Sequence, residues 1–419
     1  MTNKKIKVFI IADHPFAPSG VGTQTRYVID TLIKTGKYKF ICFGGAVEHK
    51  DYTPQQIKGY EEDWVVIPVK GYGTPDAVRS ILVNERPDIL WFMTDPRFYE
   101  WLWQMENEIR PHLPMVYYHV WDNYPYPTFN KKYYESTDVI ASISKVTYDI
   151  VNTVSPDVEN HYVPHAVDTT IFKPMPREEI NIRKKEHFGE DQKFTFIWNN
   201  RNARRKMSSS LMYWFNDFAE EVGPDKVRLI MHTEPKDPNG PDLISILKNL
   251  KADDGRIVFS TQKVPPEALA IMYNISDCTI NISDAEGFGL GTLESLACGV
   301  PIIANMTGGL QEQVTNGKEW FGIGINPASK AIIGSQQVPY IYEDRISKED
   351  FIAALKKMYS MSLEDRTEMG QKGRQHVLMN YNFENFKTTW IKLMDNIHKK
   401  YGSWETRQGY TPWVLKEIK

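Results

Sequence analysis

Short apolar runs alternate with amphipathic stretches along most of the 419-residue chain. This alternation is typical of parallel strands joined by crossover helices, so the sequence predicts the α/β class. The apolar runs of the first part of the chain predict strands at residues 7–11, 39–43, 64–69, 89–93, 115–119 and 139–142. Six such strands, with a helix predicted over residues 23–34, indicate one doubly wound domain.

A second alternating series follows a break in the pattern. Apolar periodicity fails over residues 167–183, where Pro174 and Pro176 lie close together, and we predict a linker there. Beyond it, strands are predicted at residues 194–198, 227–231, 257–259, 278–282 and 301–304. These strands predict a second doubly wound domain.

The end of the chain predicts a long amphipathic helix. Its apolar residues recur at steps of three and four, and they are Phe383, Phe386, Trp390, Leu393, Met394 and Ile397. We therefore predict an N-terminal Rossmann-like domain over residues 1–175, a C-terminal Rossmann-like domain over residues 190–380, and a helix and tail over residues 381–419.

Composition narrows the class of protein. Fifty Lys and Arg stand against 53 Asp and Glu, a net charge of −3, which disfavours a partner held by a strongly basic face. The three cysteines, Cys42, Cys278 and Cys298, lack metal or redox spacing and favour a reducing compartment. The apolar run at residues 8–12 ends at Asp13, too short for a signal peptide, and no run approaches the roughly 20 apolar residues of a membrane span. We expect a soluble, cytoplasmic protein.

The most informative segment lies between the predicted strand at 278–282 and a helix. Gly287, Gly289 and Gly291 let backbone N–H groups approach a ligand, and the helix start adds positive potential, which together suit a phosphate. Glu286 precedes this loop, and Glu294 is expected in the first turn of the helix; a carboxylate accepts two neighbouring hydroxyl hydrogens, as a sugar or ribose offers. The loop and the two acids therefore indicate a nucleotide-sugar site. An ordinary turn, with Glu294 favouring the helix dipole by about 0.3–1 kcal/mol, is the alternative.

A basic cluster follows the first strand of the second domain. Arg201, Arg204, Arg205 and Lys206 lie in a stretch without acidic residues, just before a helix whose N-terminal dipole disfavours cations. A bound diphosphate would reverse that preference. The alternative is a solvated basic loop.

These motifs resemble the retaining glycosyltransferases of family 4 (glycosyl transferases group 1). The resemblance lies first in the Glu-x7-Glu spacing from Glu286 to Glu294, which begins with Glu-Gly-Phe-Gly-Leu. It lies also in Arg201 and Lys206, which match the family's Arg-x4-Lys diphosphate pair. It implies the GT-B fold, with two facing Rossmann-like doubly wound parallel-sheet domains and a C-terminal helix returning to the first. On this resemblance, residues 1–175 form the acceptor-side domain, residues 190–380 form the nucleotide-sugar-binding domain, and the helix and tail of residues 381–419 pack back on the N-terminal domain. It also implies that Glu286 holds the hydroxyls of the transferred sugar and that Glu294 holds the ribose. The sequence departs from the family at Gly291, where proline is usual.

In the first domain, the loop after the first strand contains Gly20 and Gly22. Thr25 stands where a dinucleotide fingerprint needs its third glycine, which disfavours a nicotinamide enzyme. The resemblance places this loop near the donor diphosphate and the acceptor. The residues it implies for donor binding are Gly20, Gly22, Arg201, Lys206, Glu286, Gly287, Phe288, Gly289, Leu290 and Glu294.

His119 ends a predicted strand, where a side chain can face a ligand crevice. A buried structural histidine is the alternative, but the family has a histidine at this strand end that touches the sugar. The expected catalytic set is His119, Glu286, Arg201 and Lys206. Acceptor binding is expected at three further residues near strand ends, Asp95, Trp121 and Asp122.

The sequence thus predicts transfer of a sugar from a nucleotide-diphosphate sugar to an acceptor hydroxyl, with retention at the anomeric carbon. No Asp-x-Asp pair near a strand end marks a divalent metal site, so we expect no metal and no cofactor beyond the donor as co-substrate. A saccharide is the favoured acceptor; a hydroxylated nucleobase in DNA is the alternative, which the balanced charge disfavours. A sugar-nucleotide epimerase and a non-catalytic nucleotide-sugar binder also stay open.

Overall fold

A computed structural model describes residues 4–190 and 193–414; residues 1–3, 191–192 and 415–419, which the expected domain ranges include, lie outside it. The chain divides into two compact units. The first comprises Met1–His165, Ser335–Pro339 and Glu384–Lys419, and the second comprises Ala166–Gly334 and Tyr340–Phe383. Each is described by itself.

The first unit contains an eight-stranded sheet in the order β3-β4-β2-β1-β5-β6-β7-β8. Its strands are β1 (Ile6–Asp13), β2 (Tyr38–Gly45), β3 (Gln55–Gln56), β4 (Trp64–Pro68), β5 (Ile89–Thr94), β6 (Met115–His119), β7 (Val139–Ser142) and β8 (Glu159–Tyr162). All neighbours are parallel except β3 and β4. The six predicted strands are confirmed. The prediction missed β3, which has two exposed residues, and β8, which is polar and half-buried, because edge strands of this kind carry no apolar run.

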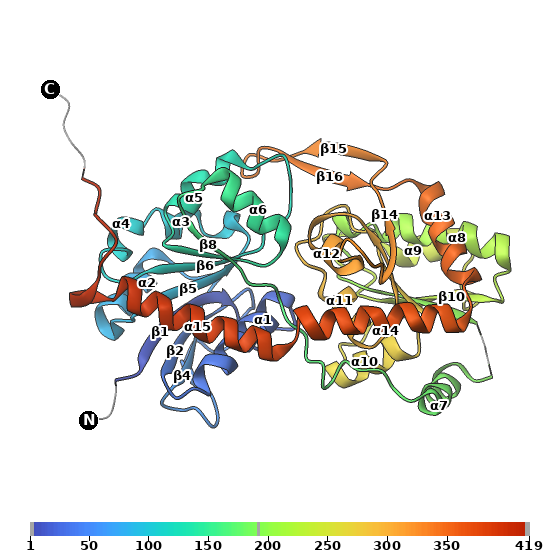
Figure 1. Cartoon of the computed structure of the whole chain (residues 1–419), viewed down its shortest axis with the longest axis horizontal. Helices are drawn as coiled ribbons and strands as arrows, with labels where there is room; N and C mark the ends of the chain where they lie inside the picture. The colour runs from blue at the N-terminus through green and yellow to red at the C-terminus, as the bar shows by residue number, and fades with distance from the viewer. Residues whose placement is uncertain (1–3, 191–192, 415–419) are drawn as a thin grey trace. The chain divides into compact units, whose positions relative to one another are not determined.

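Helices lie on both faces of this sheet (Figure 1). They are α1 (Gly20–Ile33), α2 (Pro75–Glu85), α3 (Glu100–Trp103), α4 (Glu106–Ile109), α5 (Lys131–Glu135) and α6 (Lys145–Val154), with short 3-10 turns η1 (Pro96–Phe98) and η2 (Thr128–Asn130). Helix α1 begins three residues before its predicted start, because the Ser19 side chain caps it by accepting a hydrogen bond from the Gly22 N–H at 3.0 Å.

The second unit contains a six-stranded, fully parallel sheet in the order β11-β10-β9-β12-β13-β14. Its strands are β9 (Phe194–Asn199), β10 (Val227–His232), β11 (Ile257–Ser260), β12 (Cys278–Asn281), β13 (Ile302–Asn305) and β14 (Gly322–Ile325). The five predicted strands are confirmed, and β14 was missed because its sequence alternates glycine with isoleucine. The antiparallel pair β15 (Ser329–Ile333) and β16 (Ile341–Arg345), also missed, forms a separate two-stranded sheet.

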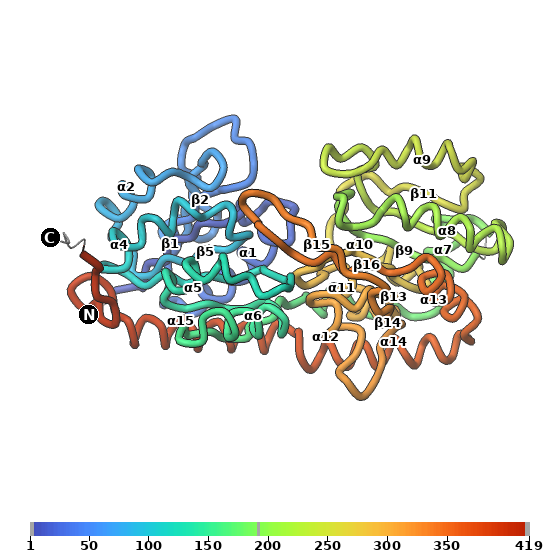
Figure 2. Tube along the Cα trace, turned by 90° about the horizontal axis from the view of Figure 1, so that it is seen from above, coloured from blue at the N-terminus to red at the C-terminus, as the bar shows by residue number. Residues whose placement is uncertain are grey.

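One helix of the second unit, α7, lies where the sequence predicts part of the linker. The helices of this unit are α7 (Arg177–Phe188), α8 (Ser208–Val222), α9 (Leu243–Leu250), α10 (Pro266–Asn274), α11 (Leu290–Ala297), α12 (Gln311–Val314), α13 (Lys348–Ser360) and α14 (Leu363–Asn380), with 3-10 turns η3 (Arg204–Lys206) and η4 (Gly308–Leu310). Helix α7 overlaps the predicted linker and buries no residue, so it has no apolar stripe by which the sequence would reveal it. Figure 2 traces α9 and α14 along opposite sides of the sheet.

The strand order creates a switch point in each sheet. In the second unit, β9 and β12 are neighbours, but the chain leaves them in opposite directions across the sheet. A crevice opens between the loops at the carboxyl ends of two such strands, and ligands of doubly wound folds bind there. Strands β1 and β5 form the equivalent point in the first unit. The two predicted doubly wound, Rossmann-like sheets are therefore confirmed.

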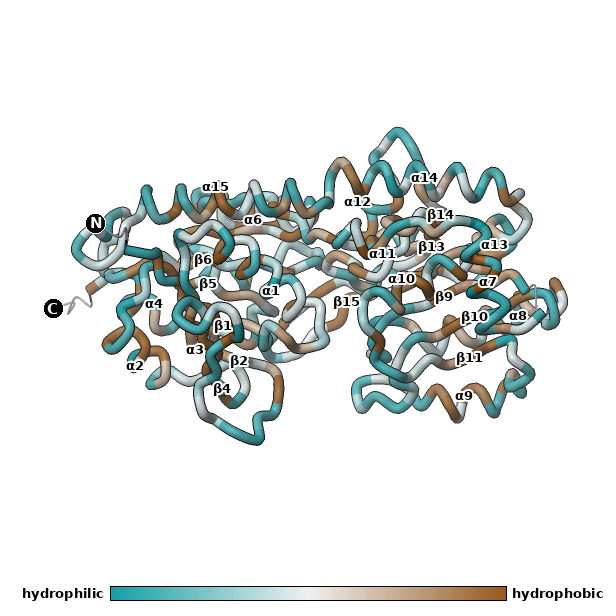
Figure 3. Tube along the Cα trace, turned by 90° about the horizontal axis from the view of Figure 1, so that it is seen from below, coloured by the Kyte–Doolittle hydropathy of each residue, from teal (hydrophilic) through white to brown (hydrophobic). Residues whose placement is uncertain are grey.

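Helix α15 (Phe383–Tyr401) packs on the first unit, as predicted. Figure 3 colours it alternately hydrophilic and hydrophobic along its length. Its buried Trp390 contacts two rings of the sheet edge-on, with ring centroids 5.9 Å from Trp91 and 4.9 Å from Tyr118. Burial of these aromatic side chains stabilises the return of the chain to the first unit.

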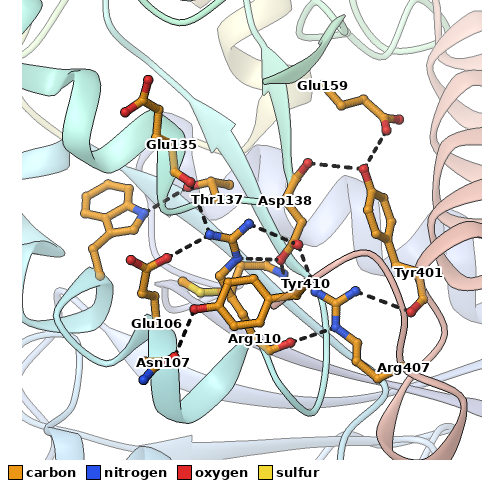
Figure 4. Close-up of polar contacts among 12 residues, drawn as sticks. Glu106, Asn107, Arg110, Glu135, Thr137, Asp138, Glu159, Tyr401, Arg407 and Tyr410 are labelled. Atoms are coloured by element: carbon orange, nitrogen blue, oxygen red, sulfur yellow. Dashed lines mark hydrogen bonds and ion pairs between the residues drawn. The ribbon is translucent and has the colours of Figure 1, made fainter. Parts of the chain in front are cut away.

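The tail after α15 is held by a buried ionic cluster (Figure 4). The Asp138 carboxylate, 1% exposed, accepts hydrogen bonds from Arg407 Nη2 at 2.8 Å, from Arg110 Nε at 3.2 Å and from the Met115 N–H at 2.9 Å. The Tyr401 hydroxyl donates to the Asp138 carbonyl at 3.4 Å. Two guanidinium groups and one backbone amide thus satisfy a carboxylate removed from water, as a buried charge requires.

In the part of the chain that the structure describes, every helix is too short or too polar to cross a bilayer.

Candidate functional site

The loops that follow β9 and β12 meet at the switch point of the second sheet. Lys206, in turn η3, forms an ion pair with Glu286, and each residue is 7% exposed. Arg205 lies 3.9 Å from the same carboxylate. Burial by itself would raise the pKa of Glu286, but the two cations outweigh it and lower the pKa to about 2. Glu286 is therefore an ionised carboxylate. It accepts hydrogen bonds and donates none, which suits the hydroxyl groups of a sugar.

The two loops are also joined through backbone atoms. The Asp284 N–H donates to the Arg205 carbonyl at 2.8 Å, and Arg205 Nη1 donates to the Ala285 carbonyl at 2.5 Å. Asp284 is 2% exposed; burial, with the nearby Glu343 carboxylate, raises its pKa to about 7. The basic loop and the acidic loop thus form one hydrogen-bonded unit.

Arg201 lies apart from this pair. It forms a bidentate contact with Asp237, in the loop after β10, with Nε 2.6 Å from Oδ2 and Nη2 3.2 Å from Oδ1. The hydrogen bond from Arg201 lowers the pKa of Asp237 to about 2. Arg204 pairs with Glu343 of β16. The side chains of Arg201, Arg204 and Arg205 are 65%, 62% and 44% exposed, so their guanidinium groups are accessible to an anionic ligand.

The glycine-rich loop is shaped by close backbone approaches. Gly289 caps α11 with φ +88°, a conformation that favours glycine. The Gly309 N–H donates to the Glu286 carbonyl at 3.0 Å, and a Cβ at Gly309 would lie 2.6 Å from the Gly287 carbonyl oxygen. Phe288 is buried, with its ring edge-on to Tyr381. Leu290 is the first residue of α11, so the loop leads directly into a helix N-terminus.

Glu294 lies in the second turn of α11, not in the first as expected, because the helix begins at Leu290. Its Oε2 accepts a hydrogen bond from the Tyr273 hydroxyl at 2.9 Å, and that hydroxyl accepts one from Asn199 Nδ2 at 2.7 Å. Burial raises the pKa of Glu294 to about 7, and the Tyr273 hydrogen bond opposes the shift only in part. Glu294 therefore changes its protonation state near neutral pH.

In the first unit, His119 ends β6 and is fully buried. Its Nε2 lies 2.9 Å from the Tyr134 hydroxyl, and Nδ1 has no hydrogen-bond partner within the described residues. Burial lowers the pKa of His119 to about 3, so the imidazole is neutral at physiological pH. The full burial of the ring agrees with the structural alternative, and the unsatisfied Nδ1 is the one feature here that a sugar contact could use.

The remaining first-unit candidates occupy loops at the same sheet edge. Gly20 and Gly22 open α1, and a Cβ at Gly22 would lie 2.8 Å from two backbone carbonyl oxygens, which by itself accounts for that glycine. Asp95 pairs with Arg97 at 3.0 Å. Trp121 is buried and donates to the Asn123 carbonyl at 3.0 Å, so it is part of the packing of its loop. Asp122 is half-buried.

Within residues 4–190 and 193–414, no group of three or more His, Cys, Asp or Glu side chains is arranged to hold a metal ion.

Several partners at the site escaped the sequence analysis. Asp237, Tyr273 and Glu343 contact Arg201, Asn199 and Arg204 across 36, 74 and 139 residues of chain. Each is a common residue type outside any motif, so no local signal marks it. Only the strand order brings it to the site.

One stretch of the second unit matches a known protein family. Residues 246–376, which include Glu286, Glu294 and the glycine-rich loop, match the family Glycosyl transferases group 1. The match covers less than a third of the chain, and it includes the Glu-x7-Glu segment on which the resemblance was based. The match begins beyond Arg201 and Lys206. The expected diphosphate role of these two residues is therefore supported by the Arg-x4-Lys resemblance and by their contacts, not by the family match.

Curated proteins are similar to part of the chain. A GDP-mannose-dependent alpha-(1-6)-phosphatidylinositol monomannoside mannosyltransferase of Mycolicibacterium smegmatis is 28% identical over 43% of this chain and 47% of its own length. An N-acetyl-alpha-D-glucosaminyl L-malate synthase of Bacillus anthracis is 26% identical over 44% of this chain and 45% of its own length. The chain thus aligns with about half the length of these curated relatives.

Solved structures extend the likeness to almost the whole chain. Sucrose-phosphate synthase from Thermosynechococcus elongatus aligns with a TM-score of 0.74 at 16% identity, covering 94% of this chain and all of that one. A structure of a trehalose-6-phosphate protein from E. coli with UDP-2-fluoro glucose bound aligns with a TM-score of 0.67 at 11% identity, covering 93% and 98%. The chain has the GT-B fold.

Proposed function

We propose that this protein is a retaining glycosyltransferase that moves a sugar from a nucleotide-diphosphate sugar to an acceptor hydroxyl. One observation carries the proposal: Lys206 and Glu286 pair at the switch point of the second sheet, beside three exposed arginines and a glycine-rich helix N-terminus. This arrangement offers cations and amides to a diphosphate and an ionised carboxylate to sugar hydroxyls.

The proposed chemistry is mainly electrostatic. When the glycosyl–phosphate bond breaks, negative charge develops on the diphosphate, and Arg201, Lys206 and the loop amides stabilise it. Glu286 holds the hydroxyls of the sugar, and Glu294 holds the ribose. The family resemblance assigns a contact with the sugar to His119. The departing phosphate accepts the proton of the acceptor hydroxyl, so the reaction needs no metal.

A saccharide is the proposed acceptor class. In the first unit, Tyr124 and Tyr126 donate hydrogen bonds to Asp149 at 3.0 and 3.2 Å, and their rings meet edge-on with centroids 5.1 Å apart. Aromatic faces beside a carboxylate suit the apolar faces and hydroxyls of a sugar. The relatives' names mention a phosphatidylinositol monomannoside and L-malate, so acceptors of other classes belong in the test.

Donor hydrolysis tests the reaction without knowledge of the acceptor. We expect slow release of UDP or GDP from one of a panel of UDP- and GDP-sugars, unchanged by EDTA, with the released sugar first appearing in the anomeric form of the donor. Lys206→Ala should slow the release by on the order of 100-fold. Lys348→Ala, which removes an exposed lysine on α13, is the matched control and should leave the rate unchanged.

Other outcomes identify other functions. Formation of an epimerised donor without nucleotide release would identify an epimerase, and tight binding without any turnover would identify a non-catalytic binder; either result contradicts the proposal. Transfer to hydroxymethylated DNA, with none to mono- or disaccharides, would contradict the proposed acceptor class alone.

A further inference from the structure

The hairpin β15–β16 has exposed residues on β15, yet the middle of β16 enters the site. An isolated two-stranded hairpin is marginally stable in water, so contacts at its base must hold it. On β16, the Glu343 side chain is 1% exposed and that of Asp344 is 20% exposed, whereas Ile332 on β15 is 64% exposed. The Glu343–Asp344 dipeptide is therefore the part of β16 that is turned into the second unit.

Glu343 contacts the basic loop. Its Oε1 accepts a hydrogen bond from Arg204, and its Oε2 accepts one from Arg345 Nη2 at 2.7 Å. Burial would raise the pKa of Glu343, but the two arginines lower it below its ordinary value, so the carboxylate is ionised. Because Arg204 and Lys206 belong to the same single turn, η3, the Glu343 contact constrains where that turn can place Lys206.

Asp344 contacts the other loop. Its N–H donates to the Asp284 carbonyl at 2.9 Å, and its Oδ2 accepts from Thr307 Oγ1 at 2.7 Å. Its carbonyl accepts from Asn305 Nδ2 at 2.5 Å, and the same Nδ2 donates to the Ser283 carbonyl at 2.9 Å. Asp344 therefore contacts Asp284, two residues before Glu286, and Thr307, which precedes the Gly308–Gly309 pair.

We propose that Glu343 and Asp344 are positioning residues for the diphosphate site: the dipeptide contacts both the basic loop and the glycine-rich loop and reinforces the direct contacts that hold them together. The proposal rests on the proposed function, since it assumes that these loops hold a nucleoside diphosphate. A cation stabilises a diphosphate only when it is held at the right place, and side chains that touch no ligand commonly provide that constraint. The hairpin is thus part of the donor site, although it lies outside the sheet that carries the site.

The test measures binding of UDP, GDP and inorganic pyrophosphate by calorimetry to the full chain. For whichever probe binds, we expect Glu343→Gln to raise the Kd by on the order of tenfold, because Arg204 loses its charged partner and the turn η3 loses its anchor. Glu343→Asp, which keeps the charge, should recover part of the affinity. With a hydrolysed donor, KM should rise by a similar factor while kcat changes less than about threefold.

Glu220→Gln is the control. Glu220 lies on α8, in the same unit but away from the two loops, and forms an ion pair with Arg256. Its substitution should leave the Kd within about twofold. Thr307→Val is a second variant for the case in which Glu343→Gln does not fold; it removes the hydrogen bond to Asp344 with little change of shape and should raise the Kd about threefold.

The outcomes separate this inference from the function on which it rests. If the unmodified protein binds none of the three probes, the proposed function fails. If it binds one, and Glu343→Gln or Thr307→Val binds as tightly as Glu220→Gln, the positioning role is wrong and the proposed function stands.

Discussion

Two glutamates of the site, eight residues apart, have opposite electrostatic behaviour. Both lie in surroundings that penalise a charged carboxylate, but only Glu286 faces cations, Lys206 and Arg205. Glu294 has the neutral hydroxyl of Tyr273 instead. The pKa values are therefore pushed apart, to about 2 for Glu286 and about 7 for Glu294. Such a difference between two like groups assigns them different roles, here a permanent anion and a group that ionises near neutral pH.

We expect this difference to appear in the pH dependence of stability. The folded-state pKa of Glu294 is raised above 4.5, so relative to Glu294→Gln the protein loses stability as the pH rises from about 4.5 through 7. At pH 8.5 Glu294→Gln should be the more stable protein by on the order of 1 kcal/mol, or a few degrees in melting temperature. Thermal melts of both proteins between pH 4.5 and 8.5 measure the effect.

Glu286→Gln is the control with the opposite sign. The folded-state pKa of Glu286 is lowered, so its contribution is present above about pH 4.5 and is lost as the pH falls toward 2. This variant should be the less stable protein at pH 7, because Lys206 is left buried without its anion. Equal pH profiles for the two variants would contradict the assignment.

At the scale of elements, the glycine-rich loop and turn η4 fit together by backbone contact. Gly309 donates its N–H to Glu286 and leaves no space for a side chain beside Gly287. The Gln313 side chain of α12 donates to the Phe288 carbonyl at 2.6 Å and fixes the next residue of the loop. The conformation of the loop therefore depends on a segment some 20 residues further along the chain.

We expect Gly309→Ala to impair the donor site more than the fold. The new Cβ would lie 2.6 Å from the Gly287 carbonyl oxygen, so the loop must shift away, and a shift of about 1 Å costs on the order of 100-fold in activity. Donor hydrolysis and UDP or GDP affinity measure the effect. Gly317→Ala, on an exposed turn where a Cβ meets nothing within 4 Å, controls for general strain at a glycine. Full activity of Gly309→Ala would show that the loop tolerates the displacement.

At the scale of the whole molecule, the chain returns to its first unit through α15 and the tail. Arg407 and Asp138, 269 residues apart, pair with 3% and 1% of their side chains exposed. The pair lies at the amino end of β7, because the Met115 N–H and the Asp138 carboxylate meet where β6 and β7 begin. The tail is thus anchored at the sheet edge opposite the one that carries His119.

We expect Arg407→Met to destabilise the first unit by about 2 kcal/mol, since Asp138 would keep Arg110 but lose its shorter ion pair. Binding of UDP or GDP, which we assign to the second unit, should be unchanged. Differential scanning calorimetry and calorimetric titration on the same samples measure both. Glu405→Gln, which breaks an exposed ion pair with Arg86, should shift neither. Loss of nucleotide affinity in Arg407→Met would show that the tail also acts on the donor site.

The sequence by itself determined the strands that are buried on both faces and the motif at the proposed donor site. Strands such as β1 and β9 read as continuous apolar runs because neither of their faces meets water. The prediction of two doubly wound sheets and of the amphipathic α15 followed from such local patterns. The same patterns do not predict β8 and α7, because neither element has a buried residue.

Only the tertiary structure decided which charges meet. The spacing of Arg201 and Lys206 suggested one diphosphate pair, but the structure turns Arg201 toward Asp237 and Lys206 toward Glu286. It also brings Glu343 to Arg204, although no sequence motif predicted the hairpin that carries Glu343. The energy of an ion pair depends on the distance between its atoms and on their removal from water, and the folding of distant segments sets both.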